Sequence, residues 1–316
     1  MVRFNFISRL VLVLGLIFYS NIIFGQINSP DSIPPPPDSL LDGREMQVPD
    51  AVLSPIVARE NVPNRKPIPY HHLRESDLMW KKKVWRMLDL KEKINHPLYY
   101  PIDKKPFDNR YSLTDLIIFA IKSPTDPVPA YEDDEFATIP YSAGQVAMNL
   151  GAKIDTVTIE ELDGSISTSM VPDPIKTELV TRYEMKEVWF FDKQRSKLEV
   201  RIVALCPIYR YVNDALATAS SGGNVPKSSI RVGWVPFKLL RPYFANNEVF
   251  NPKNDAERRS FDDIFFKRHF SSYIIQETNV YNDRKINLYK FGQDALLEGE
   301  KVKQFIFKVE HDLWEF

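Results

Sequence analysis

The sequence contains one cysteine, Cys206, and only 11 glycines among 316 residues. A single cysteine can form no internal disulfide and cannot supply a cysteine-cluster metal site. Scarce glycine disfavours folds that cradle a phosphate in a glycine-rich loop, and the nucleophile-elbow, Walker and dinucleotide-binding motifs are absent from the sequence. The lone cysteine also agrees with an oxidising compartment, where unpaired thiols are a liability.

A strong charge of one sign and metal-binding histidine patterns are missing too. The formal net charge is -1 at pH 7, whereas nucleic-acid-binding proteins usually present a basic surface. None of the five histidines falls in a zinc-binding spacing. Beyond residue 25 no stretch approaches the roughly 18 apolar residues of a membrane span, so we expect no direct span there.

Residues 1–25 are predicted to be a signal peptide. Arg3 and Arg9 precede the apolar run Leu10–Tyr19, and Gly25 offers a small residue for cleavage. The alternative is an uncleaved N-terminal anchor. No cysteine follows the apolar run, so the exported chain could not be lipidated there, and a partner would have to hold it at a membrane.

Residues 26–70 are predicted to form a proline-rich extended arm. The run Pro34–Pro37 and the further prolines exclude a helix or the interior of a sheet, and favour extended, partly polyproline II structure. The arm is either a disordered tether or a strap that docks on a neighbouring subunit. Its apolar residues favour a strap, and the candidate contact residues are Met46, Val48, Val52 and Ile56.

Residues 71–316 are predicted to form a single α+β domain. Its segments are helical over 75–151, rich in strands over 152–236 and helical again over 237–316. The fold class is therefore α+β, with a central antiparallel sheet flanked by N-terminal and C-terminal helices and preceded by the extended arm.

Capping patterns place the first helices. Ser76 or Asp77 could cap a helix that runs to about Leu90 and carries a broad apolar face. Cap patterns at Ser112 and Ser142 predict two more helices, over 113–122 and 142–150. Between the first and second helix, Pro97 and Pro101 bracket a segment that we expect to be extended.

Alternation and turn signals place the strands. The Asp163-Gly164 turn predicts a hairpin of 156–161 with 165–171. The strongest pair is 183–191 with 198–208, where the apolar residues from Leu198 to Ile208 share one face at period two. A further strand is expected at 230–235, and helices are expected at 237–244, about 256–269 and about 294–313. The apolar residues of the last helix follow helical spacing: Val302, Phe305, Ile306, Val309 and Leu313.

Few residues suggest chemistry, and we assign no catalytic, cofactor-binding or metal-binding residue. Cys206 could be a nucleophile, but its strand position predicts burial among apolar residues and an inert thiol. The acidic residues Asp133–Glu135 could bind calcium loosely, or form a solvated loop, which the absence of EF-hand spacing favours.

Trp80 and Arg86 are candidate partner contacts, because both residue types are frequent at interface hot spots. We interpret the lysines around them as a solvated face. The alternative is a contact with an acidic partner or with anionic lipid headgroups.

Several long segments of the chain are similar to the GldN/PorN family. They are DGREMQVPDAV from Asp42, RENVPNRKPIPY from Arg59, DLMWKKKVWRMLDLKEKINHPLYYP from Asp77, SLTDLIIFAI from Ser112 and VWFFDKQRSKLEVRIVALCPIY from Val188. The resemblance covers nearly all of the chain that follows the leader, including the predicted helical C-terminus.

The resemblance implies a structural, non-enzymatic role in the type IX protein secretion system and in gliding motility. Copies of the protein would form a periplasmic ring with a GldK/PorK-like outer-membrane lipoprotein, which would attach the ring to the outer membrane. GldL/GldM-like motor proteins of the inner membrane would connect to this ring from the inner-membrane side. The family carries no catalytic residues to transfer to this sequence.

A hydrolase that uses scattered carboxylates is the alternative function. The 42 acidic residues offer many carboxylate pairs, but no particular pair supports this interpretation. It would require a concave pocket with convergent acids of shifted pKa.

Overall fold

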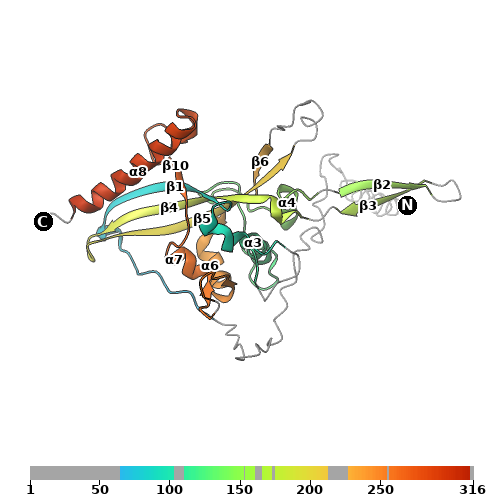
Figure 1. Cartoon of the computed structure of the whole chain (residues 1–316), viewed down its shortest axis with the longest axis horizontal. Coiled ribbons are helices and arrows are strands. Elements are labelled where there is room, and N and C mark those ends of the chain that lie inside the picture. The colour runs from blue at the N-terminus through green and yellow to red at the C-terminus, as the bar shows by residue number, and fades with distance from the viewer. Residues whose placement is uncertain are drawn as a thin grey trace, which may run out of the picture. The chain divides into compact units, whose positions relative to one another are not determined.

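The computed structural model combines helices with an antiparallel sheet, which confirms the predicted α+β class (Figure 1). The predicted signal peptide and the predicted arm up to residue 64 lie outside the described residues, and so do the candidate contacts Met46, Val48, Val52 and Ile56. The structure describes residues 65–102, 110–152, 154–160, 166–172, 175–212, 227–254 and 256–313.

The main sheet has the strand order β10-β1-β4-β5-β6, with the short strand β7 also paired to β5. Every neighbouring pair is antiparallel. The strands are β1 (Leu78–Asp89), β4 (Val180–Asp192), β5 (Lys197–Val212), β6 (Lys227–Arg231), β7 (Val235–Pro236) and β10 (Tyr273–Glu277).

The hairpin of β4 and β5 is the strand pair that the sequence predicted most strongly. Its turn lies between the paired residues Asp192 and Lys197. The register shifts where Glu187 pairs with Ile202 but Lys186 pairs with Ala204, so one β5 residue is left over as a bulge. The bulge interrupts the single apolar face predicted for β5. The apolar side chains of β5 therefore pack in three separate clusters.

The predicted helix from residue 76 to about 90 is wrong, because this segment is strand β1. Ser76 and Asp77 fall in a short 3-10 turn (η2, Glu75–Asp77), whose N-cap position makes no side-chain bond. β1 lies between β10 and β4 and buries residues on both faces, among them Val84, Trp85 and Leu88. Because both faces are buried, Val84, Trp85 and Leu88 do not follow strict alternation, and their spacing also suits one face of a helix.

Two smaller ribbons accompany the main sheet. β2 (Ile154–Glu160) pairs with β3 (Ile166–Pro172), which confirms the predicted hairpin. β8 (Glu248–Val249) pairs with β9 (Arg259–Ser260). The expected strand at 230–235 is divided, because Gly233 with φ 154° separates β6 from β7.

Four predicted helices are confirmed. Ser112 and Ser142 each accept a hydrogen bond from the backbone N–H three residues on, and Ser142 with Gln145 forms a capping box. No helix of the described residues is both long and apolar enough to cross a membrane. The four helices are α3 (Leu113–Lys122), α4 (Ala143–Asn149), α6 (Phe237–Asn246) and α8 (Gln293–Asp312).

Two other segments differ from expectation. The bracketed segment before Pro101 contains a short helix, α2 (His96–Tyr99), whose Pro97 occupies an initial position where the missing N–H costs nothing. The helix expected from 256 begins later, as α7 (Phe261–Phe266), because Ser260 and Asp263 form its capping box. The chain also contains the 3-10 turns η3 (Lys93–Asn95), η4 (Thr177–Leu179) and η5 (Ile286–Leu288).

Helices cover the long strands on two sides (Figure 1). On one side α3, α4, α6 and α7 bury the larger core, whose centre is a group of phenylalanine rings 5.5–5.9 Å apart: Phe237, Phe244, Phe261 and Phe265. On the other side α8 packs on β1 and β10 through Val84, Ile274, Ile286, Val302 and Ile306. Val302 and Ile306 are therefore buried as predicted.

Gly299 lets α8 approach β10 closely. A Cβ atom at this position would lie 2.7 Å from the carbonyl oxygen of Ile274. Backbone atoms of a paired strand cannot move aside as a flexible side chain can, so the helix itself would have to shift.

We expect Gly299→Ala to destabilise the protein, although alanine is the better helix former. The clash should outweigh the propensity gain of about 1 kcal/mol and lower the free energy of unfolding by about 1–3 kcal/mol. Urea unfolding measures the change. Gln304→Ala, on the exposed side of the same helix, is the control and should stay within about 0.5 kcal/mol of the parent. Equal stability of both variants would contradict the close contact.

Candidate interaction surfaces

The last residues of the predicted arm are attached to the folded domain. The backbone N–H of Arg65 donates to Asn246 Oδ1 at 2.7 Å, and its guanidinium lies 3.6 Å from Glu248. Arg201 Nη2 donates to the carbonyl oxygen of His71 at 2.6 Å. Residues 65–71 therefore run against α6, β8 and β5, and the part of the arm that could reach elsewhere ends at residue 64.

Tyr70 is held between two arginines. Its ring centre is 4.3 Å from the guanidinium carbon of Arg241 and 5.2 Å from that of Arg201. Arg241 in turn forms two parallel hydrogen bonds of 2.8 and 2.9 Å with the buried carboxylate of Asp262. Desolvation raises the pKa of Tyr70. Planar guanidinium groups suit such stacking, so this contact fixes where the arm leaves the domain.

A pocket of about 240 Å³ opens beside Tyr70, between β5 and the end of α7. Two of its lining residues are cations, but both already have partners. Arg201 bonds the His71 carbonyl, and Arg268 lies 2.9 Å from a carboxylate oxygen of Glu187. The pocket is therefore no evident anion site.

The predicted contacts Trp80 and Arg86 both make contacts within the chain. Trp80 on β1 is half-buried and packs against the core beneath α8. Arg86 donates from Nε and Nη2 to the hydroxyl and carbonyl oxygens of Ser272, each at 2.8 Å. Desolvation lowers the pKa of Arg86. A role for either residue at a partner surface stays a prediction.

The acidic loop at residues 132–135 is bound to the sheet, whereas we expected it to be solvated. Lys186 Nζ, on a side chain that is only 3% exposed, lies 3.1 Å from Asp134 Oδ2 and 2.7 Å from Glu135 Oε1. Trp85 Nε1 donates to Asp134 Oδ2 at 2.7 Å, and Lys83 reaches Glu135 at 2.8 Å. Among the described residues no cluster of three metal-ligating side chains occurs, here or elsewhere.

Lys82 and Lys83 were assigned to the solvated basic side of the predicted helix, but as neighbours on strand β1 they point to opposite faces of the sheet, and both have acidic partners. Lys82 lies 2.7 Å from Glu277, and Lys83 lies 2.8 Å from Glu135. Both lysines are therefore neutralised within the chain, which leaves less positive charge for an external acidic surface.

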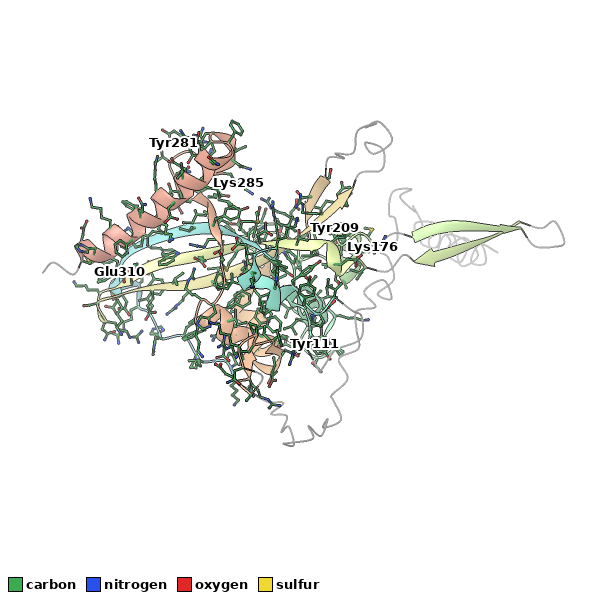
Figure 2. The ribbon with its side chains drawn as sticks, in the orientation of Figure 1. Tyr111, Lys176, Tyr209, Tyr281, Lys285 and Glu310 are labelled. Carbon is green, nitrogen blue, oxygen red and sulfur yellow. The ribbon has the colours of Figure 1, made fainter. Side chains whose placement is uncertain are left out.

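Buried carboxylates of β4 connect the sheet with the C-terminal segments. Glu184 accepts two hydrogen bonds from Arg231 and one of 3.1 Å from Lys285. Glu187, which is fully buried, pairs with Arg268 at the end of α7. Lys285 lies in the loop between β10 and α8 (Figure 2), so these pairs help to fix that loop on the sheet.

A set of exposed apolar side chains lies on this same loop and on the first turns of α8. Its members are large apolar side chains that are each more than half exposed. We call them the α8 patch: Val280, Tyr281, Leu288, Phe291, Leu296 and Leu297, with exposures of 90, 67, 66, 76, 53 and 60%.

Sequence reasoning did not identify the α8 patch. It assigned Phe305 to the buried stripe of the helix, but this ring is 49% exposed beneath the Lys82 ammonium, 4.8 Å from its centre. A signal was present, because Leu296 and Leu297 do not share the helical face of Val302 and Ile306. An apolar residue off the buried stripe of an amphipathic helix is a candidate for contact with a partner.

Cys206 lies in the core, as predicted. It is fully buried beside Trp85, Ala204 and Trp234. Burial raises the pKa of its thiol to about 12, so the reactive thiolate is not formed near neutral pH.

The Glu135 ion pairs make the loop sensitive to acid. Hydrogen bonds from Lys186 and Lys83 lower the pKa of Glu135 from 4.5 to about 2. A carboxyl whose pKa is lower in the folded state stabilises the fold above its unfolded pKa, and this stabilisation is lost as the pH falls from about 4.5 toward 2.

We therefore expect Glu135→Gln to flatten the dependence of stability on pH in this window. Urea unfolding midpoints measured between pH 6 and about 2.5 should fall less steeply for Glu135→Gln than for the parent. Glu132→Gln, in the same loop and exposed, is the matched control and should follow the parent curve. A Glu135→Gln curve parallel to the parent would show that these ion pairs contribute nothing.

Comparison with known proteins identifies the family. A family model described as gliding motility associated protein GldN matches residues 73–315. No curated protein matches the chain. The match begins just after the tethered residues 65–71 and covers the sheet and both helical layers, so the chain belongs to the GldN family of gliding motility associated proteins.

Proposed function

We propose that this protein is a structural subunit of the periplasmic, outer-membrane-associated ring of the type IX secretion system. In that role it supports protein secretion and gliding motility. The observation that carries the proposal is membership of the GldN family over residues 73–315. The predicted leader without a lipidation cysteine supports an exported subunit that depends on a lipidated partner.

The arrangement of side chains supports an assembly role. Glu135, Glu257 and Asp263 have pKa values below their usual range, and each hydrogen-bonds a neighbouring group in its own chain. A catalytic general acid needs a raised pKa, so none of these three carboxyl groups is suited to that role. The α8 patch is a cluster of exposed apolar side chains, and such clusters mark contacts with other proteins.

The proposed partners are those that the family resemblance implies. A GldK/PorK-like lipoprotein would attach the subunit to the outer membrane, further copies of the chain would complete the ring, and GldL/GldM-like motor proteins would meet it from the inner-membrane side. Met46, Val48, Val52 and Ile56 of the arm are the proposed contacts with a neighbouring subunit.

Purification tests the ring proposal. A chain tagged at its C-terminus should co-purify from detergent-solubilised outer membranes with a lipoprotein, and electron microscopy should show rings. Removing the gene should abolish secretion of type IX cargo, and the tagged chain should restore it. A soluble monomer without a lipoprotein partner, or normal secretion without the gene, would contradict the proposal.

The arm should contribute to assembly through its apolar residues. Replacing residues 44–64 with a Gly/Ser spacer of equal length keeps the reach of the arm and the tether at Arg65 but removes the apolar contacts. We expect fewer rings in the membrane fraction with unchanged thermal unfolding of the purified chain. Replacing Pro34–Pro37 alone is the control. Normal ring yield from the 44–64 variant would show that the arm is only a spacer.

A further inference from the structure

The α8 patch is an unusual surface for a protein without a partner. Isolated exposed apolar residues are common, but here six large ones lie within the 18 positions from Val280 to Leu297. They belong to one loop and one helix, both packed on the edge strand β10. This surface is therefore a candidate docking site.

The loop that carries four of the six patch residues is held by contacts of its own. Arg284 stacks on Tyr281 and Tyr289, with 5.4 and 4.5 Å between guanidinium carbon and ring centres. Asn279 Oδ1 accepts from the backbone N–H groups of Tyr281 and Arg284, and Ile286 is buried beneath the loop. A preformed surface loses little conformational entropy when a partner binds.

Charged pairs border the apolar side chains on α8. Glu298 pairs with Lys301, and Glu300 pairs with Lys303, each at 3.1 Å. An apolar centre with a charged, solvated border is the usual anatomy of a protein interface.

The arm of this chain has the composition to occupy such a surface. Between residues 46 and 57 its apolar residues are Met46, Val48, Val52, Leu53, Ile56 and Val57. Pro49 and Pro55 favour an extended backbone before binding, and extended proline-containing segments bind apolar grooves at low entropic cost.

The place where the arm leaves the domain points to a neighbouring copy. Arg65 is bound to Asn246 and Glu248, at the end of α6, whereas α8 lies on the other side of the long strands (Figure 1). Val57 precedes Arg65 by eight residues, which span at most about 28 Å when fully extended. A strap on its own α8 would have to pass around the sheet. In a head-to-tail ring, the α6 side of one copy can face the α8 side of the next.

We propose that the α8 patch binds residues 46–57 of the arm of an adjacent copy of this chain. The inference rests on the proposed ring and adds the receiving surface. Each subunit then contributes a strap on one side and a docking site on the other, which gives a heterologous interface that closes into a ring.

Disulfide cross-linking tests the contact directly, because the only native thiol, Cys206, is buried and unreactive. The double variant Val52→Cys/Leu297→Cys, oxidised in native outer membranes, should give a ladder of linked dimers, trimers and larger species that collapses to monomer with reductant. The matched control is Val52→Cys/Leu239→Cys, which places the second thiol at an exposed leucine of α6 and should give no ladder.

Co-expression of the two single variants distinguishes a disulfide between neighbouring copies from a disulfide within one chain. Val52→Cys in one copy and Leu297→Cys in the other should give a linked dimer and no ladder. Rings that assemble without any Val52–Leu297 linkage would overturn the strap contact and leave the proposed function intact. A disulfide that forms only within single chains of the double variant would also overturn the strap contact between copies. Failure to recover any rings would instead count against the proposed function.

Discussion

Three residues of strand β4 bury charge that must be neutralised within the chain. Glu184, Lys186 and Glu187 are each at most 6% exposed. Leaving such a charge unpaired costs several kcal/mol, so the partners constrain the rest of the structure. Those partners come from segments far apart in the sequence: the acidic loop, β6, the end of α7 and the loop before α8. The central strand thereby holds the periphery of the domain.

The α8 patch is a consequence of this organisation. Lys285, bound to Glu184, and Gly299, in contact with Ile274, hold the C-terminal loop and helix against the edge of the sheet. Ile286, Val302 and Ile306 fill the space beneath, and the six residues of the α8 patch are left exposed. An apolar surface on one side and a tethered arm on the other would suit a heterologous contact between identical subunits.

Local sequence signals were reliable where one interaction decides the structure. The Ser112 and Ser142 caps set the starts of α3 and α4, and alternation identified β4 and β5. They were misleading in β1, because burial on both faces produces a pattern that also suits a helix. Trp80 and Arg86, two of the candidate contacts, lie in the described part of the fold, but no partner is assigned to them. The α8 patch was not predicted from the sequence.

The sequence by itself determined the α+β class, the capped helices, the central hairpin, the buried thiol of Cys206 and the resemblance to the GldN family. The structural features depend on periodicity, capping and composition, whereas the resemblance depends on the identity of long segments of sequence. Only the tertiary structure decided that β1 is a strand, that the acidic loop binds Lys186 and that Leu296 and Leu297 face solvent. Each of these depends on which distant segments pack together, and residue spacing carries no information about that.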